Sequence, residues 1–365
     1  MTVVVEPALP PGTTTREPAV ARTTRPVDGP PPRLRSLDVL RGLAIAAMLL
    51  VDNPGVPGAH PRQLVHSPWN GLRFADVVFP VFLVAVGVAI PFSRRAAAPR
   101  LVARRVAALI ALSVVLHVLK HGDVSPAGVL QHIAGSYAVA WLVLRLRPRA
   151  QFVATGTLLA GAWAAYTWIS GHGVIAGSWA PGSTPGAYLD RLVYGAPQTE
   201  GIVPMVLGAV NVMAGAFVGQ ALRRRVTPAA RRRVLAVSAA AWTAAGLLLA
   251  VAVPVNKRLW TPSYAVLTAG IALTALLVVH ELTDTGRRAR WSQPLRELGT
   301  NAIAVFVASQ LFTILALPAV APVVTRPLVP LVGPAAASAL FALLVVAAAS
   351  ALARVMWRRG WFLKV

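Results

Sequence analysis

His66 is the side chain best suited to proton transfer in this 365-residue sequence. An imidazole titrates close to neutral pH, so it can take a proton from a substrate and return it. If the segment around His66 is helical, Trp69 and Asn70 share its face, because they follow at i+3 and i+4. Asp52 or Asp76 could orient the ring, as a carboxylate does in triad-type sites. The alternative is an interfacial histidine beside a tryptophan of the aromatic belt.

Two further segments place polar side chains at the start of apolar runs. Gln131 and His132 need partners inside a helix bundle, either for function or for packing between helices. Glu200 stands in Gln198-Thr199-Glu200-Gly201, just before another apolar run. A helix dipole favours a carboxylate there, so Glu200 is either a simple helix start or a site residue.

Later segments add an amide-rich and cationic group. Asn256, Lys257 and Trp260 lie in a short polar stretch with Arg258, which suggests a site for an anion or a sugar. The alternative is an interface anchor made of Trp and Lys. Asn301 lies inside a later apolar run, where a single amide usually packs between helices.

Clusters of arginine separate several apolar runs, as at Arg94, Arg95, Arg223–Arg225 and Arg231–Arg233. They are first of all determinants of membrane topology. They could also hold the phosphates of a lipid or of coenzyme A.

No metal site is expected from this sequence. His117 and His121 have the i, i+4 spacing of metal ligands, but no third ligand accompanies them. The absence of cysteine excludes disulfides, thiolate ligands and a cysteine nucleophile.

The composition explains how these side chains are positioned. Hydrophobic residues make up 56% of the chain and charged residues 13%, with a mean hydropathy of +0.64. A soluble domain carries about 25% charged residues. The apolar runs show no alternation of period two, and only helices or closed barrels satisfy their backbone in lipid. We therefore predict an all-α, polytopic membrane bundle with the lipid bilayer as its partner.

The net charge of +23 would suggest a nucleic-acid partner in a soluble chain. Here most of the 35 Lys and Arg residues fall in segments that alternate helices place on one side, so we expect no nucleic acid. The positive-inside rule then puts both termini in the cytoplasm. The predicted transmembrane helices number about ten, at residues 37–51, 75–93, 101–119, 127–144, 151–169, 202–222, 234–253, 262–280, 299–317 and 335–353.

Two parts of the chain are distinguished by composition. Residues 1–32 are rich in Pro, Thr and Arg without an apolar core, which predicts a disordered cytoplasmic tail. Residues 33–365 form the predicted transmembrane domain. High Ala and Arg content is typical of a bacterium with a GC-rich genome, so we place the domain in a bacterial cytoplasmic membrane.

The polar segments, taken in order, resemble the heparan-α-glucosaminide N-acetyltransferase family and its bacterial relatives. The segments that carry this resemblance are Arg35–Leu43, His66–Gly71, Asp76–Pro80, Gly128–Ile133, Glu200–Gly201, Asn256–Thr261 and Asn301–Ala302. One such motif would be weak, whereas the ordered set is specific for the family. The family pattern has Arg where this chain has His132, and Asp-Pro-Glu-Gly where this chain has Gln198–Gly201.

The resemblance implies a transmembrane acyltransferase that moves an acetyl group from cytoplasmic acetyl-CoA to an amino sugar or another envelope glycan at the outer face. The active-site histidine of the family falls on His66, which would act as general base or acyl carrier. The resemblance further suggests a homodimer. The residues it assigns are catalytic at His66, Asp52, Asn53 and Asn70, substrate-binding at Trp69, Asp76, Glu200, Asn256, Lys257, Trp260 and Asn301, and donor-binding at Gln131, His132, Arg94 and Arg95.

A transporter or flippase that moves a glycan or small solute without acyl chemistry is the main alternative. Transporters often contain paired, interrupted helices from internal repeats, and we find no such repeat here. A homologue without activity that scaffolds an envelope assembly is a third reading.

Overall fold

The computed structural model describes the chain in five stretches, residues 34–93, 95–124, 128–225, 227–284 and 290–362. The predicted tail at residues 1–32 lies outside these stretches, as does Arg94. Residues 33–365 form one compact unit.

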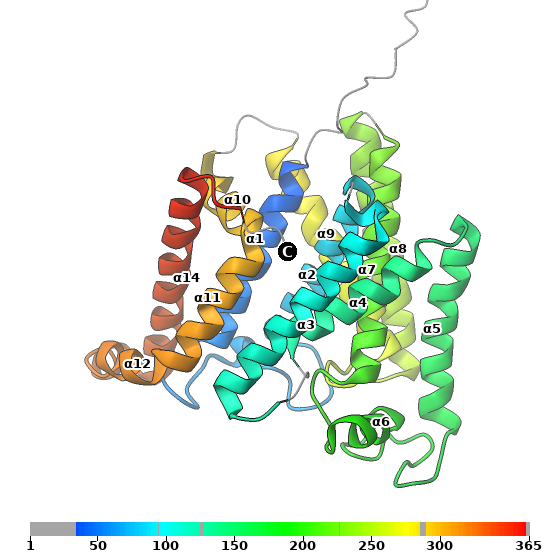
Figure 1. Cartoon of the computed structure of the whole chain (residues 1–365), viewed down its shortest axis with the longest axis horizontal. Coiled ribbons are helices and arrows are strands. Elements are labelled where there is room, and N and C mark those ends of the chain that lie inside the picture. The colour runs from blue at the N-terminus through cyan, green and yellow to red at the C-terminus, as the bar shows by residue number, and fades with distance from the viewer. Residues whose placement is uncertain (1–33, 94, 125–127, 226, 285–289, 363–365) are drawn as a thin grey trace, which may run out of the picture. The chain divides into compact units, whose positions relative to one another are not determined.

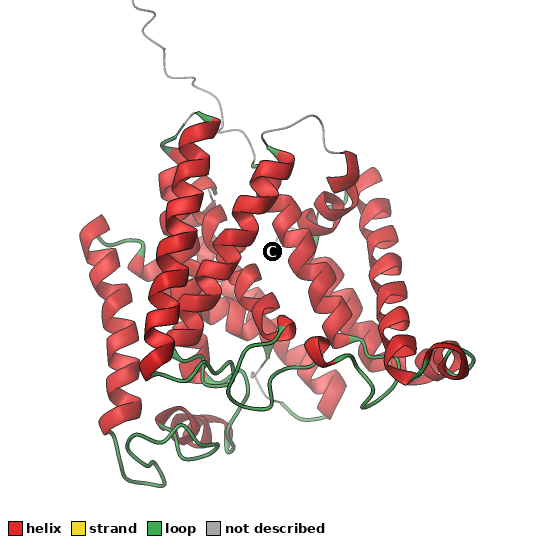
Figure 2. Cartoon of the chain, turned by 180° about the vertical axis from the view of Figure 1, so that it is seen from behind, coloured by secondary structure: helices red, strands yellow, loops and turns green. Residues whose placement is uncertain are grey.

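The regular structure of the described stretches is helical, apart from one isolated bridge between Gly171 and Val174 (Figure 2). The all-α prediction is therefore confirmed. The α-helices are α1 (Arg35–Asp52), α2 (Phe74–Ala89), α3 (Pro99–His121), α4 (Val129–Val143), α5 (Pro148–Trp168), α6 (Pro185–Tyr194), α7 (Ile202–Arg223), α8 (Pro228–Ala252), α9 (Pro262–Thr283), α10 (Gln293–Thr300), α11 (Ala302–Leu315), α12 (Leu317–Thr325), α13 (Val329–Val332) and α14 (Pro334–Arg358).

Each predicted span overlaps a helix of the described chain. Six segments are long and apolar enough to cross a membrane, namely α2 with its extension to Phe92, α3, α7, α8, α9 and α14. A seventh crossing is added if the bent pair of α10 and α11 counts as one span. α4 is apolar but has only 15 residues. The molecule is thus a multi-pass membrane protein, while the count of ten stays a prediction.

The two ends of the bundle differ in character. α7 begins just after Glu200 and ends at Arg223, so these residues lie at opposite ends of one helix. Figure 1 shows α10 at the upper end of the bundle, and α6 and α12 at the lower end. His66 and Lys257 lie in the loops that lead into α2 and α9, at the same end as Glu200. Which end faces the cytoplasm stays a prediction.

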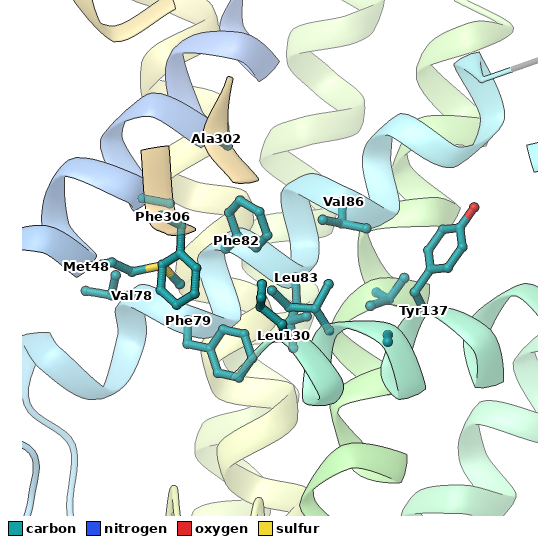
Figure 3. Close-up of a cluster of buried hydrophobic side chains, with 14 of the residues drawn as sticks. Met48, Val78, Phe79, Phe82, Leu83, Val86, Leu130, Tyr137, Ala302 and Phe306 are labelled. Carbon is teal, nitrogen blue, oxygen red and sulfur yellow. The ribbon is translucent and has the colours of Figure 1, made fainter. Parts of the chain in front are cut away.

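The apolar core lies between α1, α2, α4, α7, α9 and α11. Met48 of α1, Val78 of α2 and Phe306 of α11 point toward one another there (Figure 3). α2 and α7 pack with their backbones in close approach, because a Cβ at Gly87 would meet the Val212 carbonyl. Small residues at such positions stabilise membrane helix pairs through close van der Waals contact.

The predicted span at residues 299–317 is broken in the structure. α10 and α11 meet at an angle of 74°, with Asn301 at the break. α10 packs against α1 and α14, whereas α11 continues toward the end of α1 and into α12. This bend brings the middle of α11 beside Asn53.

Candidate active site

His66 and Asp76 form a hydrogen-bonded pair at the start of α2. Asp76 is in the first turn of the helix, and its Oδ2 accepts hydrogen bonds from the backbone N–H groups of Ser67 and Arg73 at 3.1 and 3.0 Å. Its Oδ1 lies 2.9 Å from His66 Nδ1. The Asp76 side chain is fully buried, whereas 43% of the His66 side chain is exposed.

This arrangement selects the tautomer of His66. An ionised carboxylate only accepts hydrogen bonds, so the proton of a neutral His66 ring belongs on Nδ1. The lone pair of Nε2 is then available on the exposed side of the ring. The buried, helix-capping carboxylate therefore prepares the histidine to act as a base or a nucleophile.

Lys257 lies against the same imidazole. Its Nζ is 3.3 Å from His66 Nδ1 and 3.2 Å from Nε2, although 191 positions separate the two residues in sequence. A positive charge at this distance from the reactive nitrogen is placed to stabilise an oxyanion that forms beside it.

The loop that carries Lys257 is fastened to the loop that carries His66. The Asn256 side chain is buried, and its Nδ2 donates to Asn70 Oδ1 at 3.0 Å. Asn256 Oδ1 accepts from the Leu259 N–H at 3.0 Å. Gly71 N–H donates to the Val255 carbonyl at 2.8 Å. Asn70 and Asn256 thus hold two chain segments in register.

Trp69 does not lie where a helical segment through His66 would place it. Residues 65–73 are a loop, so Trp69 and Asn70 do not share a helix face with His66. The Trp69 indole N–H donates to the Trp179 carbonyl at 2.7 Å, and Arg258 lies 6.0 Å from its ring centroid. The condition for a shared helix face, a helical segment around His66, is therefore not met.

A second histidine–carboxylate pair lies deeper. His132 Nδ1 is hydrogen-bonded to Glu200 Oε2, and the His132 side chain is fully buried. Its ring packs against Trp260, with centroids 4.5 Å apart, and against Phe79 at 4.9 Å. Trp260 has a φ of 50°, which is strained for a bulky residue, and its indole N–H donates to Asn211 Oδ1 at 3.0 Å.

Glu200 lies in the loop before α7, within electrostatic range of His132, Lys257 and His66. Burial by itself raises the pKa of its carboxyl group. The neighbouring His132, Lys257 and His66 outweigh that effect and hold the Glu200 pKa below its ordinary value. The two histidine–carboxylate pairs are therefore parts of one electrostatic cluster.

Asp52 and Asn53, both of which the family resemblance assigns as catalytic, face different neighbours. The Asp52 carboxylate interacts electrostatically with Lys257 and His66. Asn53 is buried and turned to α11, where its Oδ1 accepts from Thr313 Oγ1 at 2.9 Å and its Nδ2 donates to Ser309 Oγ at 3.3 Å. Asp52 thus lies within electrostatic range of Lys257 and His66, whereas the Asn53 side chain is hydrogen-bonded to α11.

Of the predicted donor-binding residues, Gln131 and His132 are neighbours in α4, whereas Arg95 lies apart from them. Gln131 lies in the first turn of α4, directly before His132. Its Nε2 donates to Tyr194 Oη at 3.0 Å. Arg95 is exposed beyond the far end of α2. Asn301 lies at the break before α11, about two turns of helix from Ser309, so the structure does not bring it to His66.

Sequence reasoning missed a pair of arginines inside the bundle. Arg41 of α1 interacts electrostatically with Arg105 of α3, and the Arg105 guanidinium lies 4.8 Å from the Tyr137 ring centroid. The Arg105 Nε is buried without a hydrogen-bond partner in the described chain. Both arginines were counted as topology signals. Their positions within helices rather than in loops were the signal that could have singled them out.

The sequence is also similar to known proteins. Residues 33–250 match the family model described as heparan-alpha-glucosaminide N-acetyltransferase, catalytic. The human heparan-alpha-glucosaminide N-acetyltransferase is 28% identical over 362 aligned positions, which cover 77% of this chain and 53% of the human protein. The mouse protein of the same name is 27% identical over 361 positions, covering 76% and 53%.

The chain therefore spans about half the length of these two relatives. The match to the family model extends over more than half of the chain and includes His66, Asp76, His132 and Glu200. Lys257 and Asn301 lie beyond it. By this match, the chain belongs to the heparan-alpha-glucosaminide N-acetyltransferase catalytic family.

Proposed function

We propose that this protein is a membrane acetyltransferase that moves an acetyl group from cytoplasmic acetyl-CoA to an amino sugar or another envelope glycan at the outer face. The observation that carries the proposal is the exposed His66 ring, whose Nδ1 is held by buried Asp76 and whose Nε2 lies 3.2 Å from Lys257 Nζ. The activity named for the human and mouse relatives supports the same chemistry.

In the direct route, the acceptor nitrogen attacks the thioester carbon while His66 Nε2 takes a proton from that nitrogen. The Lys257 ammonium stabilises the oxyanion of the tetrahedral intermediate. Collapse of the intermediate breaks the carbon–sulfur bond, and the departing thiolate receives the proton from His66. In the second route, Nε2 itself attacks the thioester carbon, and the carbon–sulfur bond breaks to release the thiolate of CoA. The acceptor amine then attacks the acetyl carbon, the bond to Nε2 breaks, and the proton lost by the amine neutralises the thiolate.

The residues inside the bundle suit the phosphates of the donor better than the surface arginines do. Arg41 is eleven residues before Asp52, which is about 16 Å along α1. Arg95 lies beyond a helical segment of 19 residues, about 28 Å from the His66 end. Arg105, with its buried and unpartnered Nε, is also positioned for a charge-assisted hydrogen bond to phosphate.

The test is acetyl transfer by the purified protein in detergent, with labelled acetyl-CoA and a panel of amino sugars. We expect transfer by the wild type and its loss in His66→Ala. His121→Ala is the matched control, because His121 is also exposed and lies at the end of α3. Undiminished transfer in His66→Ala would overturn the role given to His66.

A transporter remains the alternative to be excluded by the same preparation. Solute uptake into proteoliposomes without acetyl-CoA, combined with no transfer to any acceptor, would favour it. We also propose a homodimer in the cytoplasmic membrane of a bacterium, with the basic end inside. Crosslinking in native membranes and labelling of engineered cysteines from each side test these two points.

A further inference from the structure

An apolar cavity of about 370 Å³ lies between α11, α12 and α14. Its lining includes Phe312, Phe341 and Leu352, and Ser309 is the single polar residue among those that line it in the described chain. Leu344 and Leu352 on its wall are 55% and 42% exposed, so the cavity opens toward the surface of the helix bundle. α12 lies beside the lower ends of α11 and α14 (Figure 1).

Small side chains create this space. Ala308 of α11 and Ala348 and Ala349 of α14 line it, where larger residues would bring the two helices into contact. An apolar space of this kind in a membrane protein favours hydrocarbon over water, because no polar group in it can bind several waters.

One hydrogen bond links the lining of the cavity to the end of α1. Ser309, which lines it, accepts a hydrogen bond from Asn53 Nδ2 at 3.3 Å. Asn53 directly follows Asp52, whose carboxylate interacts with Lys257 and His66. Phe341, another lining residue, packs against Gly55 in the chain that follows. The contact between Asn53 and Ser309 thus places one wall of the cavity beside the C-terminal end of α1, next to Asp52.

We propose that the acetyl acceptor is an amphiphile, an amino sugar carried on a lipid, whose hydrocarbon chain occupies this cavity while its amine reaches His66. This inference rests on the acetyl transfer proposed above and names the substrate class. The cavity is apolar, and the cluster around His66 is charged. A molecule with an apolar tail and a polar head has the same two parts. The occupants that would contradict it are a bilayer phospholipid and a second copy of the chain.

The first test compares acceptors in protein reconstituted into nanodiscs. Glucosamine and dodecyl glucosaminide carry the same amine and differ in the hydrocarbon chain. We expect kcat/KM for the alkylated acceptor to exceed that for glucosamine by about tenfold or more, because the chain leaves water for an apolar site. Equal values for the two acceptors would overturn the proposal.

Matched variants separate the cavity from simple partitioning into the bilayer. Ala348→Phe fills the cavity, whereas Ala347→Phe adds the same ring at the neighbouring exposed position outside its lining. The ratio of kcat/KM for the two acceptors should fall toward one in Ala348→Phe and keep its wild-type value in Ala347→Phe. Ala308→Leu, on the opposite wall, gives a smaller change of the same sign. Identical ratios in the Ala347 and Ala348 variants would overturn the proposal.

The second test needs no activity. Dodecyl glucosaminide with a photoreactive diazirine in its tail should label peptides of α11 and α14, and unlabelled dodecyl glucosaminide should compete. Equal competition by phosphatidylglycerol would identify a bilayer-lipid site, and crosslinks between two chains would identify a subunit contact; either contradicts the proposal. Specific labelling without acetylation of any acceptor would support the binding site and refute the proposed transferase.

Discussion

Two histidine–carboxylate pairs lie at opposite ends of α9 and have almost the same hydrogen-bond length. His66 Nδ1 is 2.9 Å from Asp76 beside the loop that leads into α9, and His280 Nδ1 is 3.0 Å from Asp284 at its last turn. Their surroundings differ, because the His66 side chain is 43% exposed and the His280 side chain only 4%. Both histidines make the same kind of hydrogen bond through Nδ1. They differ in how accessible the rest of the ring is, since only the His66 side chain is substantially exposed.

The pair at His280 fastens two helices. Asp284 also accepts a hydrogen bond from Ser36 Oγ at 2.6 Å, which ties the start of α1 to the end of α9. Burial raises the pKa of Asp284, but the hydrogen bonds from His280 and Ser36 outweigh it and hold the pKa below its ordinary value. A histidine–carboxylate pair therefore does not identify a catalytic site unless a substrate can reach the imidazole.

The largest expected contrast is between His66→Ala and His280→Ala. Loss of a general base lowers kcat by about 10²- to 10⁴-fold, so His66→Ala should lose acetyl transfer. His280→Ala should retain transfer and show a lower Tm, because it removes a hydrogen bond to a partly buried carboxylate. Steady-state transfer assays and thermal unfolding of both variants measure the contrast. A loss of kcat in His280→Ala at unchanged Tm would contradict it.

Lys257 distinguishes the His66 end of α9 from the His280 end in a second way, through the positive charge proposed to stabilise the oxyanion. Its Nζ lies within 3.3 Å of both ring nitrogens of His66. Lys257→Met should lower kcat by about 10²- to 10³-fold, the effect of removing one oxyanion donor. Lys257→Arg keeps a cation and should recover part of the rate. If Met and Arg reduce kcat equally, the charge is not what Lys257 contributes.

The helices could be predicted from sequence more fully than the site could. Each continuous apolar run predicted a helix, and the structure has a helix at each of these positions. The reason is that backbone N–H and C=O groups in a bilayer must form their hydrogen bonds within the protein. The break at Asn301 was missed, since an Asn within an apolar run does not by itself indicate a bend. The short helices α12 and α13 lie almost entirely between the predicted spans 299–317 and 335–353, in a stretch rich in Pro and Val where no helix was predicted.

The contacts within the candidate site could be predicted from sequence patterns only in part. The sequence offered Asp76 as one of two partners for His66, and the structure confirms that contact. Asn256 and Lys257 were singled out separately, and the structure brings Lys257 to His66 and Asn256 to Asn70. Their pairing joins segments far apart in sequence, which helix periodicity within one segment does not report. Arg105 was read only as a charge at the edge of a span, because its burial depends on the packing of α3 against other helices.

A smaller effect is expected where the carboxylate, rather than the histidine, is changed. Asp76→Asn keeps the shape of the side chain but removes the charge that fixes the Nδ1–H tautomer of His66. We expect kcat to fall by about 10- to 100-fold, as for other residues that orient a reactive group. The pH dependence of kcat should change with it. Asp284→Asn, the equivalent change at the other end of α9, should leave that pH profile as it is in the wild type.

The smallest effect concerns acid stability at the His280 end. Because the Asp284 pKa is lowered on folding, the ionised carboxylate stabilises the fold above the ordinary carboxyl pKa. That contribution is lost as the pH falls through the lowered value. The Tm of the wild type should therefore decrease on acidification below about pH 4, and that of Asp284→Asn should decrease less. Asp123→Asn is the control, because the Asp123 side chain is 71% exposed and its ion pair with His117 at 3.3 Å contributes little. Equal acid sensitivity of wild type and Asp284→Asn would show that the Ser36, His280 and Asp284 contacts do not stabilise the folded helix bundle.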